Sequence, residues 1–246
     1  TVFIQALRWN VAIFLTLSAA SCSQPKTDSS TNDKWANHFN VEKANFSSTG
    51  RNTYFILEPG YQMRFEGTED GKPGRLVITV LDQTMQLDGV ETRVVEERET
   101  SADQLVEVSR NYFAIDRSTG DVYYFGEDSQ TYRDGKVAGN GGSWWSGKDG
   151  AHFGLFMPAK PVVGQKFYQE LAPNVAMDRC EITSRSELMK VPAGNFENCL
   201  KTSETSPLEP DSQEYKLYAP DVGLVIDGGL VLVKFGSAEK NDGGHQ

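Results

Sequence analysis

Residues 111–161 have the sequence NYFAIDRSTGDVYYFGEDSQTYRDGKVAGNGGSWWSGKDGAHFGLFMPAKP, and this stretch decides the fold. It carries two of the chain's four tryptophans and a dense run of tyrosine, phenylalanine, glycine and acidic residues. The turn-forming segment 116–121 leads into the apolar run 122–125, which is typical of a β-strand. We expect this stretch to supply both the middle of the fold and any pocket.

Short β-type segments bounded by turn residues lie on both sides of this stretch. The predicted strands cover residues 54–57, 61–65, 75–81, 92–97, 105–114, 122–125, 166–171, 180–191, 196–202, 214–218, 222–226 and 230–235. The run RLVITVL at 75–81 is apolar on both faces, as expected for an interior strand. The sequence therefore predicts an all-β fold with little helix. It would be a single antiparallel meander that forms either a curved half-barrel or a two-sheet sandwich, and only the curved sheet would offer a cavity.

The amino-terminal segment has the features of an export signal. Arg8 precedes the apolar run VAIFLTL at 11–17, small residues follow, and Cys22 comes next. The apolar run is too short to span a bilayer stably. The cysteine after small residues resembles the bacterial lipobox, which implies lipidation of Cys22, with a plainly secreted protein as the alternative.

This pattern predicts an exported lipoprotein, anchored in the membrane through Cys22 and facing the periplasm or the cell surface. The expected division of the chain is a signal peptide at 1–21, a lipidated cysteine and flexible tether at 22–39, a single β domain at 40–236 and a disordered tail at 237–246. Trp35 and Phe39 have the spacing of a short helix.

The charge of the chain excludes several partners. The formal net charge is −10, and it becomes −11 once Arg8 is removed with the signal peptide. Binding to nucleic acid is driven by lysine and arginine that neutralise phosphates, so this balance argues against it. It also argues against electrostatic docking on anionic lipid.

The remaining cysteines, Cys180 and Cys199, raise the question of a disulfide, which an oxidising compartment would allow. A hairpin turn at 192–195 would place Cys199 opposite Leu188 and leave Cys180 without the other cysteine across from it. The disulfide therefore stays an open alternative. A zinc site is disfavoured because neither cysteine has a close-spaced partner, and no metal or cofactor is expected.

Several motifs resemble those of a known group. They are YFGE at 124–127, GSW at 142–144 with the glycines after it, VPAGNF at 191–196 and YAPDVGLV at 218–225. They resemble motifs of a group of bacterial exported proteins and lipoproteins of undefined function. Asp221 stands where that pattern has glycine, at a turn where a positive φ is expected. A looser likeness to curved half-barrel periplasmic proteins, including lipoprotein carriers, implies a half-barrel and allows lipid binding, but it brings no catalytic residue.

The strongest candidate recognition surface is the tryptophan pair in a glycine-rich setting. Adjacent residues of a strand point to opposite faces, so one indole can be buried while the other is exposed to a ligand. The alternative is that both indoles are packing residues. The candidate ligand-binding residues are Trp144, Trp145, Tyr124, Phe153, His152 and Glu127.

Other residue patterns are weaker. Asp116, Ser118 and Glu127 have the first, third and last positions of a calcium loop, but the glycine required at position six is replaced by Asp121, which favours a turn leading into a strand. His152 could form an acid–base pair with Asp149, although a structural histidine is the simpler interpretation. No Gly-x-Ser-x-Gly elbow is present.

The function favoured by these patterns is a non-catalytic, lipid-anchored β domain that binds an apolar or amphipathic ligand, or a partner protein, near the tryptophans. The alternative is a glycan-binding or glycan-cleaving surface lipoprotein, which would use the same tryptophans with Glu127 or His152 and two carboxylates about 5–9 Å apart. A structural envelope protein without a concave pocket is a third hypothesis.

Overall fold

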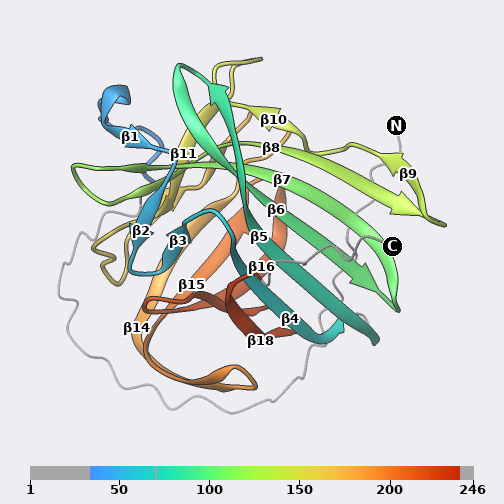
Figure 1. Ribbon diagram of the computed structural model, residues 1–246. Coiled ribbons are helices and arrows are strands. Elements are labelled where there is room, and N and C mark those ends of the chain that lie inside the picture. Colours follow the sequence, from blue (N-terminus) through green and yellow to red (C-terminus); the bar gives the residue numbers. More distant parts are fainter. Residues whose placement is uncertain (1–33, 70, 239–246) are drawn as a thin grey trace, which may run out of the picture.

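The computed structural model describes residues 34–69 and 71–238 (Figure 1). The expected signal peptide, Cys22, most of the tether and most of the tail lie outside the described residues. The described chain is almost entirely β-structure, with one short 3₁₀ turn, η1 (Lys43–Asn45), and no α-helix among these residues. The predicted fold class is therefore confirmed.

The strands alternate with short turns along the whole described chain. They are β1 (Phe46–Ser47), β2 (Gly50–Asn52), β3 (Phe55–Leu57), β4 (Tyr61–Glu69), β5 (Lys72–Leu87), β6 (Val90–Ser101), β7 (Gln104–Asp116), β8 (Val122–Arg133), β9 (Lys136–Gly139), β10 (Trp144–Trp145), β11 (His152–Met157), β12 (Lys166–Tyr168), β13 (Glu170–Leu171), β14 (Arg179–Val191), β15 (Gly194–Ser206), β16 (Glu209–Ala219), β17 (Gly223–Asp227) and β18 (Leu230–Ser237).

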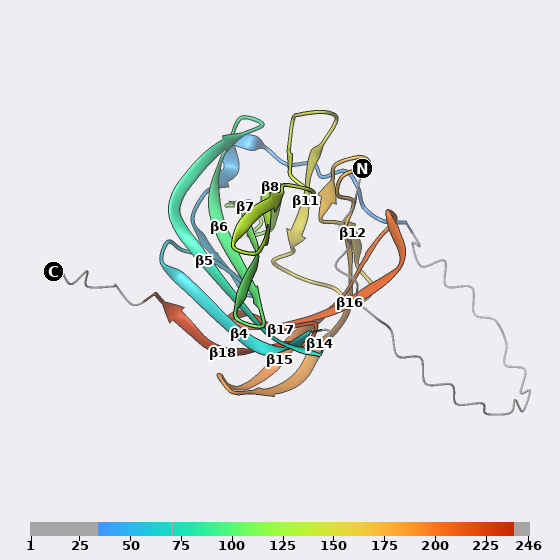
Figure 2. The same cartoon turned by 90° about the vertical axis from the view of Figure 1, so that its right-hand side faces the viewer.

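One large antiparallel sheet curls until its two ends meet, as the view in Figure 2 shows. Its strand order is β12-β14-β15-β16-β17-β18-β4-β5-β6-β7-β8-β11-β13. The first and last strands of this order, β12 and β13, are consecutive in the chain and are separated by Gln169 alone. The sheet is thus nearly closed and barrel-like, which decides between the two predicted forms in favour of the curved sheet.

A glycine makes room for this closure. Gly154 on β11 lies so close to the segment joining β12 to β13 that a Cβ built on it would be 2.3 Å from the Gln169 carbonyl oxygen and 2.6 Å from that of Tyr168. Contacts this short are not seen for real Cβ atoms, so a side chain here would push the joining segment away from the sheet. Gly154 therefore allows the two ends of the sheet to approach.

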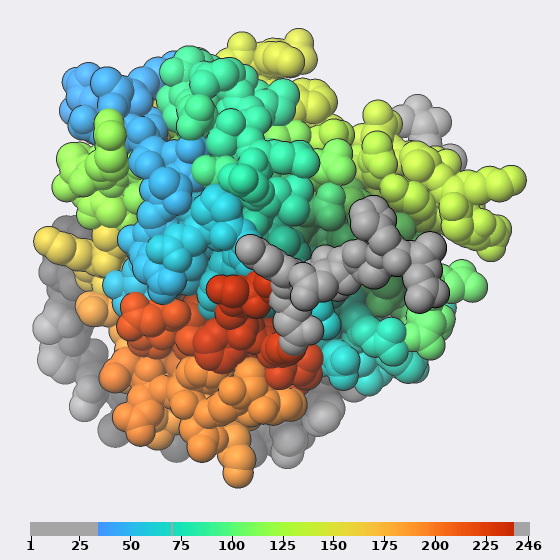
Figure 3. Space-filling model, viewed as in Figure 1, coloured from blue at the N-terminus to red at the C-terminus, as the bar shows by residue number. Residues whose placement is uncertain are grey.

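The seam between the carboxy-terminal and amino-terminal halves is made by β18 and β4. The pairing runs from Leu230 opposite Gly67 to Ser237 opposite Tyr61. In the space-filling view of Figure 3 the red carboxy-terminal segment adjoins the blue-green strands without a gap. The small second sheet, β2 with β3, lies outside this strand order and covers part of the interior.

The turn chemistry explains much of this topology. Asp88 and Gly89 have φ of +48° and +77° and join β5 to β6, as expected for an Asp-Gly hairpin turn of the mirror-image type. Asp221 has φ of +61°, and its N–H donates to the Thr53 carbonyl oxygen at 2.7 Å. The glycine-like conformation expected at this position is thus present, with aspartate adopting it.

The structure corrects three local expectations. Residues 67–69 and 72–74, which lie between the predicted strands at 61–65 and 75–81, belong to β4 and β5, and Glu69 pairs with Lys72. Residues 35–39 form no helix; Ala36 pairs with Phe167, and the Trp35 ring lies 4.5 Å from the Arg179 guanidinium, so the ordered chain begins before residue 40.

The third correction concerns the β14–β15 hairpin. Its turn is two residues long, since Val191 pairs with Gly194, and the register shifts again between Met189 and Glu187. Cys199 therefore lies opposite Glu187 rather than Leu188. Cys180 and Cys199 are both buried and both free, so they form no disulfide with each other.

Candidate ligand-binding cavity

The curled sheet encloses a cavity of about 210 Å³. One part of its wall is apolar, and Phe55, Ile56, Met63, Ile78, Val80, Val95, Phe113, Phe156 and Leu224 form it. The other part is acidic, and Glu97, Glu99, Glu107, Glu127, Glu170, Asp178, Glu204 and Asp227 line it together with Lys216. The interior is therefore amphipathic. The apolar part of a bound ligand would contact the apolar wall, and its polar group would contact the acidic wall.

Aromatic rings form the apolar end. Phe55 of β3 packs against Phe113 of β7 and Phe156 of β11, with ring centroids 5.0 Å and 5.3 Å apart. Phe113 and Phe156 are themselves 4.8 Å apart. Because β3 belongs to the small second sheet, this sheet places an aromatic side chain on the interior of the large one.

Tyr124 marks the change from apolar to polar wall. Its ring is stacked on Phe113 with centroids 4.6 Å apart, and Trp144 meets it edge-on at 5.3 Å from the other side. Its hydroxyl donates to Asn111 Oδ1 at 2.6 Å and lies 3.3 Å from Glu127 Oε2. A hydroxyl has one proton, so once that proton is given to Asn111 the Glu127 contact is best satisfied by a protonated carboxyl that donates to the tyrosine oxygen.

Lys216 neutralises part of the acidic wall. Its Nζ lies 3.3 Å from Glu204 Oε2 and 3.6 Å from Asp227 Oδ1. Burial alone would lower the pKa of Lys216, but the charges of Asp227 and Glu204 outweigh it and hold the pKa well above its usual value. Glu204 also accepts from Gln169 Nε2 at 3.4 Å, which ties the joining segment of the sheet to this cluster.

The remaining carboxyl groups have no cation within ion-pair distance among the described residues. Burial is the main cause that raises the pKa of Glu97 to about 7 and those of Glu99 and Glu127 to about 8, and the neighbouring acids raise them further. Burial likewise raises the pKa of Glu170 well above its usual value, with Asp178 and Glu127 adding to the effect. Near neutral pH the cavity thus holds protons on several of its carboxyl groups.

Some of the predicted site residues line the cavity, and others lie outside it. Tyr124 and Glu127 line the cavity. Trp144 is only 3% exposed and does not line it, because the indole lies behind Tyr124 and supports that ring. Trp145 is half-buried outside the cavity, with the Lys148 ammonium 5.1 Å from its ring. The tryptophan pair thus packs around the site instead of forming its mouth.

His152 and Phe153 also lie outside the cavity. His152 is exposed, and Phe153 packs against Phe125 and Phe46, with ring centroids 4.8 Å and 6.1 Å apart. The acid–base pair imagined for His152 therefore has no access to the interior carboxylates. Asp116, the first residue of the rejected calcium loop, accepts hydrogen bonds from the Ser118 N–H and hydroxyl, which makes it a turn residue leading towards β8.

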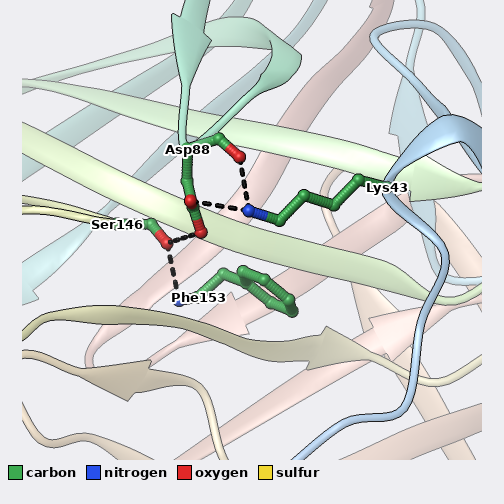
Figure 4. Close-up of polar contacts among 4 residues, drawn as sticks. All are labelled: Lys43, Asp88, Ser146 and Phe153. Atoms are coloured by element: carbon green, nitrogen blue, oxygen red, sulfur yellow. Dashed lines mark hydrogen bonds and ion pairs between the residues drawn. The ribbon is translucent and has the colours of Figure 1, made fainter.

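A polar clamp holds the tryptophan segment in place (Figure 4). The Ser146 hydroxyl donates to Asp88 Oδ2 at 3.2 Å and accepts from the Phe153 N–H at 3.0 Å. Lys43 Nζ donates to the carbonyl oxygen and to Oδ1 of Asp88, both at 2.6 Å. Since Ser146 is 2% exposed and both of its contacts are structural, this cluster fixes a loop and does not present a nucleophile.

Sequence reasoning missed most of the acidic wall, although a signal existed. Every second residue of β6 and β7 lines the cavity, and the residues between them belong to the opposite face of the sheet. The lining residues are Val95, Glu97 and Glu99 in β6 and Glu107, Ser109 and Asn111 in β7. A single face of these strands changes from apolar to acidic partway along, which is unusual for a core face.

The acidic side chains of the cavity wall do not form a metal site. Among residues 34–69 and 71–238, no three histidine, cysteine or acidic side chains converge closely enough to hold a metal ion. The carboxyl groups are instead spread along the wall. The described residues also contain no helix with the length and hydrophobicity needed to span a bilayer.

Comparisons with known proteins add little to this geometry. No protein-family model and no curated protein matches the chain. Among solved structures, it is similar to that of a candidate lipoprotein from Parabacteroides distasonis ATCC 8503, at 14% sequence identity over 76% of this chain and 100% of that chain, with a TM-score of 0.37. A likeness at this level is no basis for inferring a function, so the function has to be inferred from the cavity.

Proposed function

We propose that this protein is a non-catalytic, lipid-anchored β domain that binds a small amphipathic ligand inside its curled sheet. The observation that carries the proposal is the cavity inside the curled sheet, which has an apolar and an acidic part of its wall. Anchoring through a lipid on Cys22, in the periplasm or at the cell surface, is proposed from the sequence, as is membership of the lipoprotein group with the shared motifs.

The size of the cavity limits the ligand. An engineered apolar cavity of about 150 Å³ in another protein binds benzene, which has six non-hydrogen atoms. By that measure, about 210 Å³ accommodates about eight non-hydrogen atoms. A whole phospholipid or fatty acid would not fit, so the ligand is either a small amphiphile or the end of a larger molecule.

The glycan-cleaving alternative receives less support. Two interior carboxyl groups, Glu127 and Glu170, are close enough for the charge of Glu127 to raise the pKa of Glu170. However, a sugar needs an exposed aromatic platform and room for polar hydroxyls, whereas Trp144 is buried and half of the cavity wall is apolar. The interior suits an apolar body with one polar group better than it suits a sugar ring.

A cavity-filling substitution tests the proposal. Val95 lines the cavity and is 3% exposed, so Val95→Phe would place extra carbon atoms in the cavity. Binding of hexan-1-ol, hexylamine and hexanoate would be followed by isothermal titration calorimetry on the full chain. We expect at least one of the three to bind the wild-type protein with a stoichiometry of one, and Val95→Phe to reduce that affinity by at least tenfold.

A matched control is Val137→Phe, which makes the same change at a side chain that is 58% exposed and outside the cavity. This variant should bind as the wild type does. If none of the three compounds binds the wild-type protein, or if Val95→Phe binds them unchanged, the cavity is not a binding site and the proposal fails.

A further inference from the structure

The charge balance of the cavity wall indicates which polar group the ligand carries. Eight carboxyl groups line the cavity, and Lys216 is the single basic residue among the described residues that line it. Lys216 is within ion-pair distance of Glu204 and Asp227. The remaining acidic wall therefore lacks a positive partner.

Glu170 is the clearest member of this unpaired set. It is 8% exposed and lines the cavity, and no hydrogen bond or ion pair in the described part of the chain involves its carboxyl group. A buried polar group without a partner is costly, and such groups are usually satisfied by water or by a ligand. Glu170 directly follows Gln169, whose backbone lies close to Gly154 of β11.

Other carboxyl groups near Glu170 have only neutral donors. Glu127 contacts the Tyr124 hydroxyl at 3.3 Å, and Glu107 accepts from the Ser129 hydroxyl at 3.1 Å. Neither contact supplies a positive charge. Together with Glu170, these groups form an acidic wall that faces the aromatic rings of Phe113 and Phe156 across the same cavity.

We infer that the ligand is a small organic cation, a primary amine on an apolar body of about six to eight carbon atoms. Its ammonium group donates to Glu170 and Glu127, and its hydrocarbon or aromatic part packs against Phe55, Phe113 and Phe156. An ammonium group suits this wall better than a metal ion does, because no three acids in the described residues converge on one point. A bound ammonium group favours the ionised form of the carboxyl groups that it contacts, so these groups lose their protons on binding, whereas an anionic amphiphile would add a further negative charge to an acidic wall. This inference rests on the proposed function and specifies its ligand.

The test compares three ligands of one chain length that differ only in the polar group. Hexylamine, hexan-1-ol and hexanoate are titrated into the full chain at pH 8 by isothermal titration calorimetry. Hexylamine is a cation at this pH, as lysine is. A charge-assisted contact is worth about tenfold or more in affinity, so we expect hexylamine to bind at least tenfold more tightly than hexan-1-ol and hexanoate not to bind.

Two variants locate the recognition. Glu170→Gln should bring the affinity for hexylamine to within about threefold of that for hexan-1-ol, and Glu127→Gln should lower the preference as well. Glu197→Gln removes the same charge at an exposed position outside the cavity and should keep the full preference.

Each outcome decides something. If hexan-1-ol or hexanoate binds as tightly as hexylamine, the inference of a cationic ligand is wrong, but the proposal that the cavity binds a ligand is retained. If hexylamine is preferred but Glu170→Gln and Glu127→Gln leave the preference unchanged, these carboxyl groups do not recognise the amine and the inference is overturned. If none of the three compounds binds, the proposed function fails with it.

Discussion

Glu170 shows how a single side chain connects the fold to the proposed function. It directly follows Gln169, the residue that joins the two ends of the sheet, so closing the sheet places its carboxyl group inside. Burial raises its pKa well above the usual range, and the charges of Asp178 and Glu127 raise it further. Burial also raises the pKa values of other acids of the wall, and these shifts make the stability of the fold depend on pH.

The direction of the pKa shifts determines whether raising the pH stabilises or destabilises the folded protein. Below pH 4.5 the glutamates are protonated in both the folded and the unfolded chain. Above that pH the unfolded chain loses the protons, while folded Glu97 keeps its proton up to about pH 7 and folded Glu99 and Glu127 keep theirs up to about pH 8. Unfolding therefore releases protons in this window, and raising the pH favours unfolding.

We predict that the free energy of unfolding falls by about 2 kcal/mol or more between pH 5 and pH 8. Urea denaturation at several pH values measures it. The groups that contribute are the interior acids whose pKa values are raised, namely Glu97, Glu99, Glu107, Glu127, Glu170 and Asp178. The other titratable groups that line the cavity are Tyr124, Glu204, Lys216, Tyr218 and Asp227. A free energy of unfolding that rises over this range would show that the interior acids are ionised in the folded protein.

Glu99→Gln isolates one of these groups. Glutamine cannot ionise, so the variant should lose less stability between pH 5 and pH 8 and should be more stable than the wild type at pH 8, by about 1 kcal/mol. Glu197→Gln, at an exposed position, should follow the wild-type curve. Parallel curves for Glu99→Gln and the wild type would count against a proton held at Glu99.

At this scale the sequence identified part of the site. Tyr124 and Glu127 lie in a short, aromatic strand segment, and both reach the cavity. The tryptophans were indistinguishable from ligand-binding residues because exposure depends on what packs beside them, and only the fold shows that Tyr124 stands between Trp144 and the interior. The alternation of β6 and β7 was the signal for the buried acids, but it was missed among the 34 acidic residues of the chain.

At the scale of elements, the approach of β11 to the segment joining β12 and β13 depends on Gly154. Gly154→Ala would place a Cβ 2.3 Å from the Gln169 carbonyl oxygen, so the joining segment has to move. We predict a loss of about 3 kcal/mol or more in the free energy of unfolding, measured by urea denaturation.

The control for this change is Gly141→Ala, where a Cβ would meet nothing within 4 Å and φ is not in the left-handed region. It should alter the stability by less than about 0.5 kcal/mol. Equal stability of Gly154→Ala and the wild type would mean that the sheet does not need this close approach.

The clamp on the tryptophan segment gives a second prediction for an element. Ser146→Ala removes the partner of the Phe153 N–H and of Asp88 Oδ2 at a buried site. A loss of about 1–3 kcal/mol is expected from leaving these groups unsatisfied, and the thermal midpoint should fall accordingly. Ser186→Ala, at an exposed serine of β14, should leave the midpoint unchanged; equal effects of the two variants would argue against the clamp.

Strand positions were largely predictable, but strand lengths and pairing were not. The apolar centres of β5, β6 and β7 were found, whereas their polar ends were read as loops or left out, because hydrogen bonds to neighbouring strands extend a strand beyond its apolar part. The β14–β15 register differs from the expected one because the chain turns at Pro192 and Ala193 and because the pairing shifts further along the hairpin, first between Met189 and Glu187. One shifted turn moves every facing pair.

For the whole molecule, the two-sided apolar strands predicted either a curved sheet or a two-sheet sandwich, because a strand buried on both faces needs material on each side, and the structure has the curved sheet. Here Phe46 and the segment around it cover the outside of β8, and the interior lies on the other face. The closure itself was not predictable, since it depends on Gln169 linking strands that stand at opposite ends of the sheet order.

A crystal structure of the full chain grown with hexylamine at pH 8 is the most direct test of whether the interior of the curled sheet binds a small amine. We expect density for one molecule between the Phe113 and Phe156 rings and the acidic wall, with its nitrogen within hydrogen-bond distance of the Glu170 carboxyl group. An interior filled by its own side chains, or hexylamine bound on the surface alone, would contradict it.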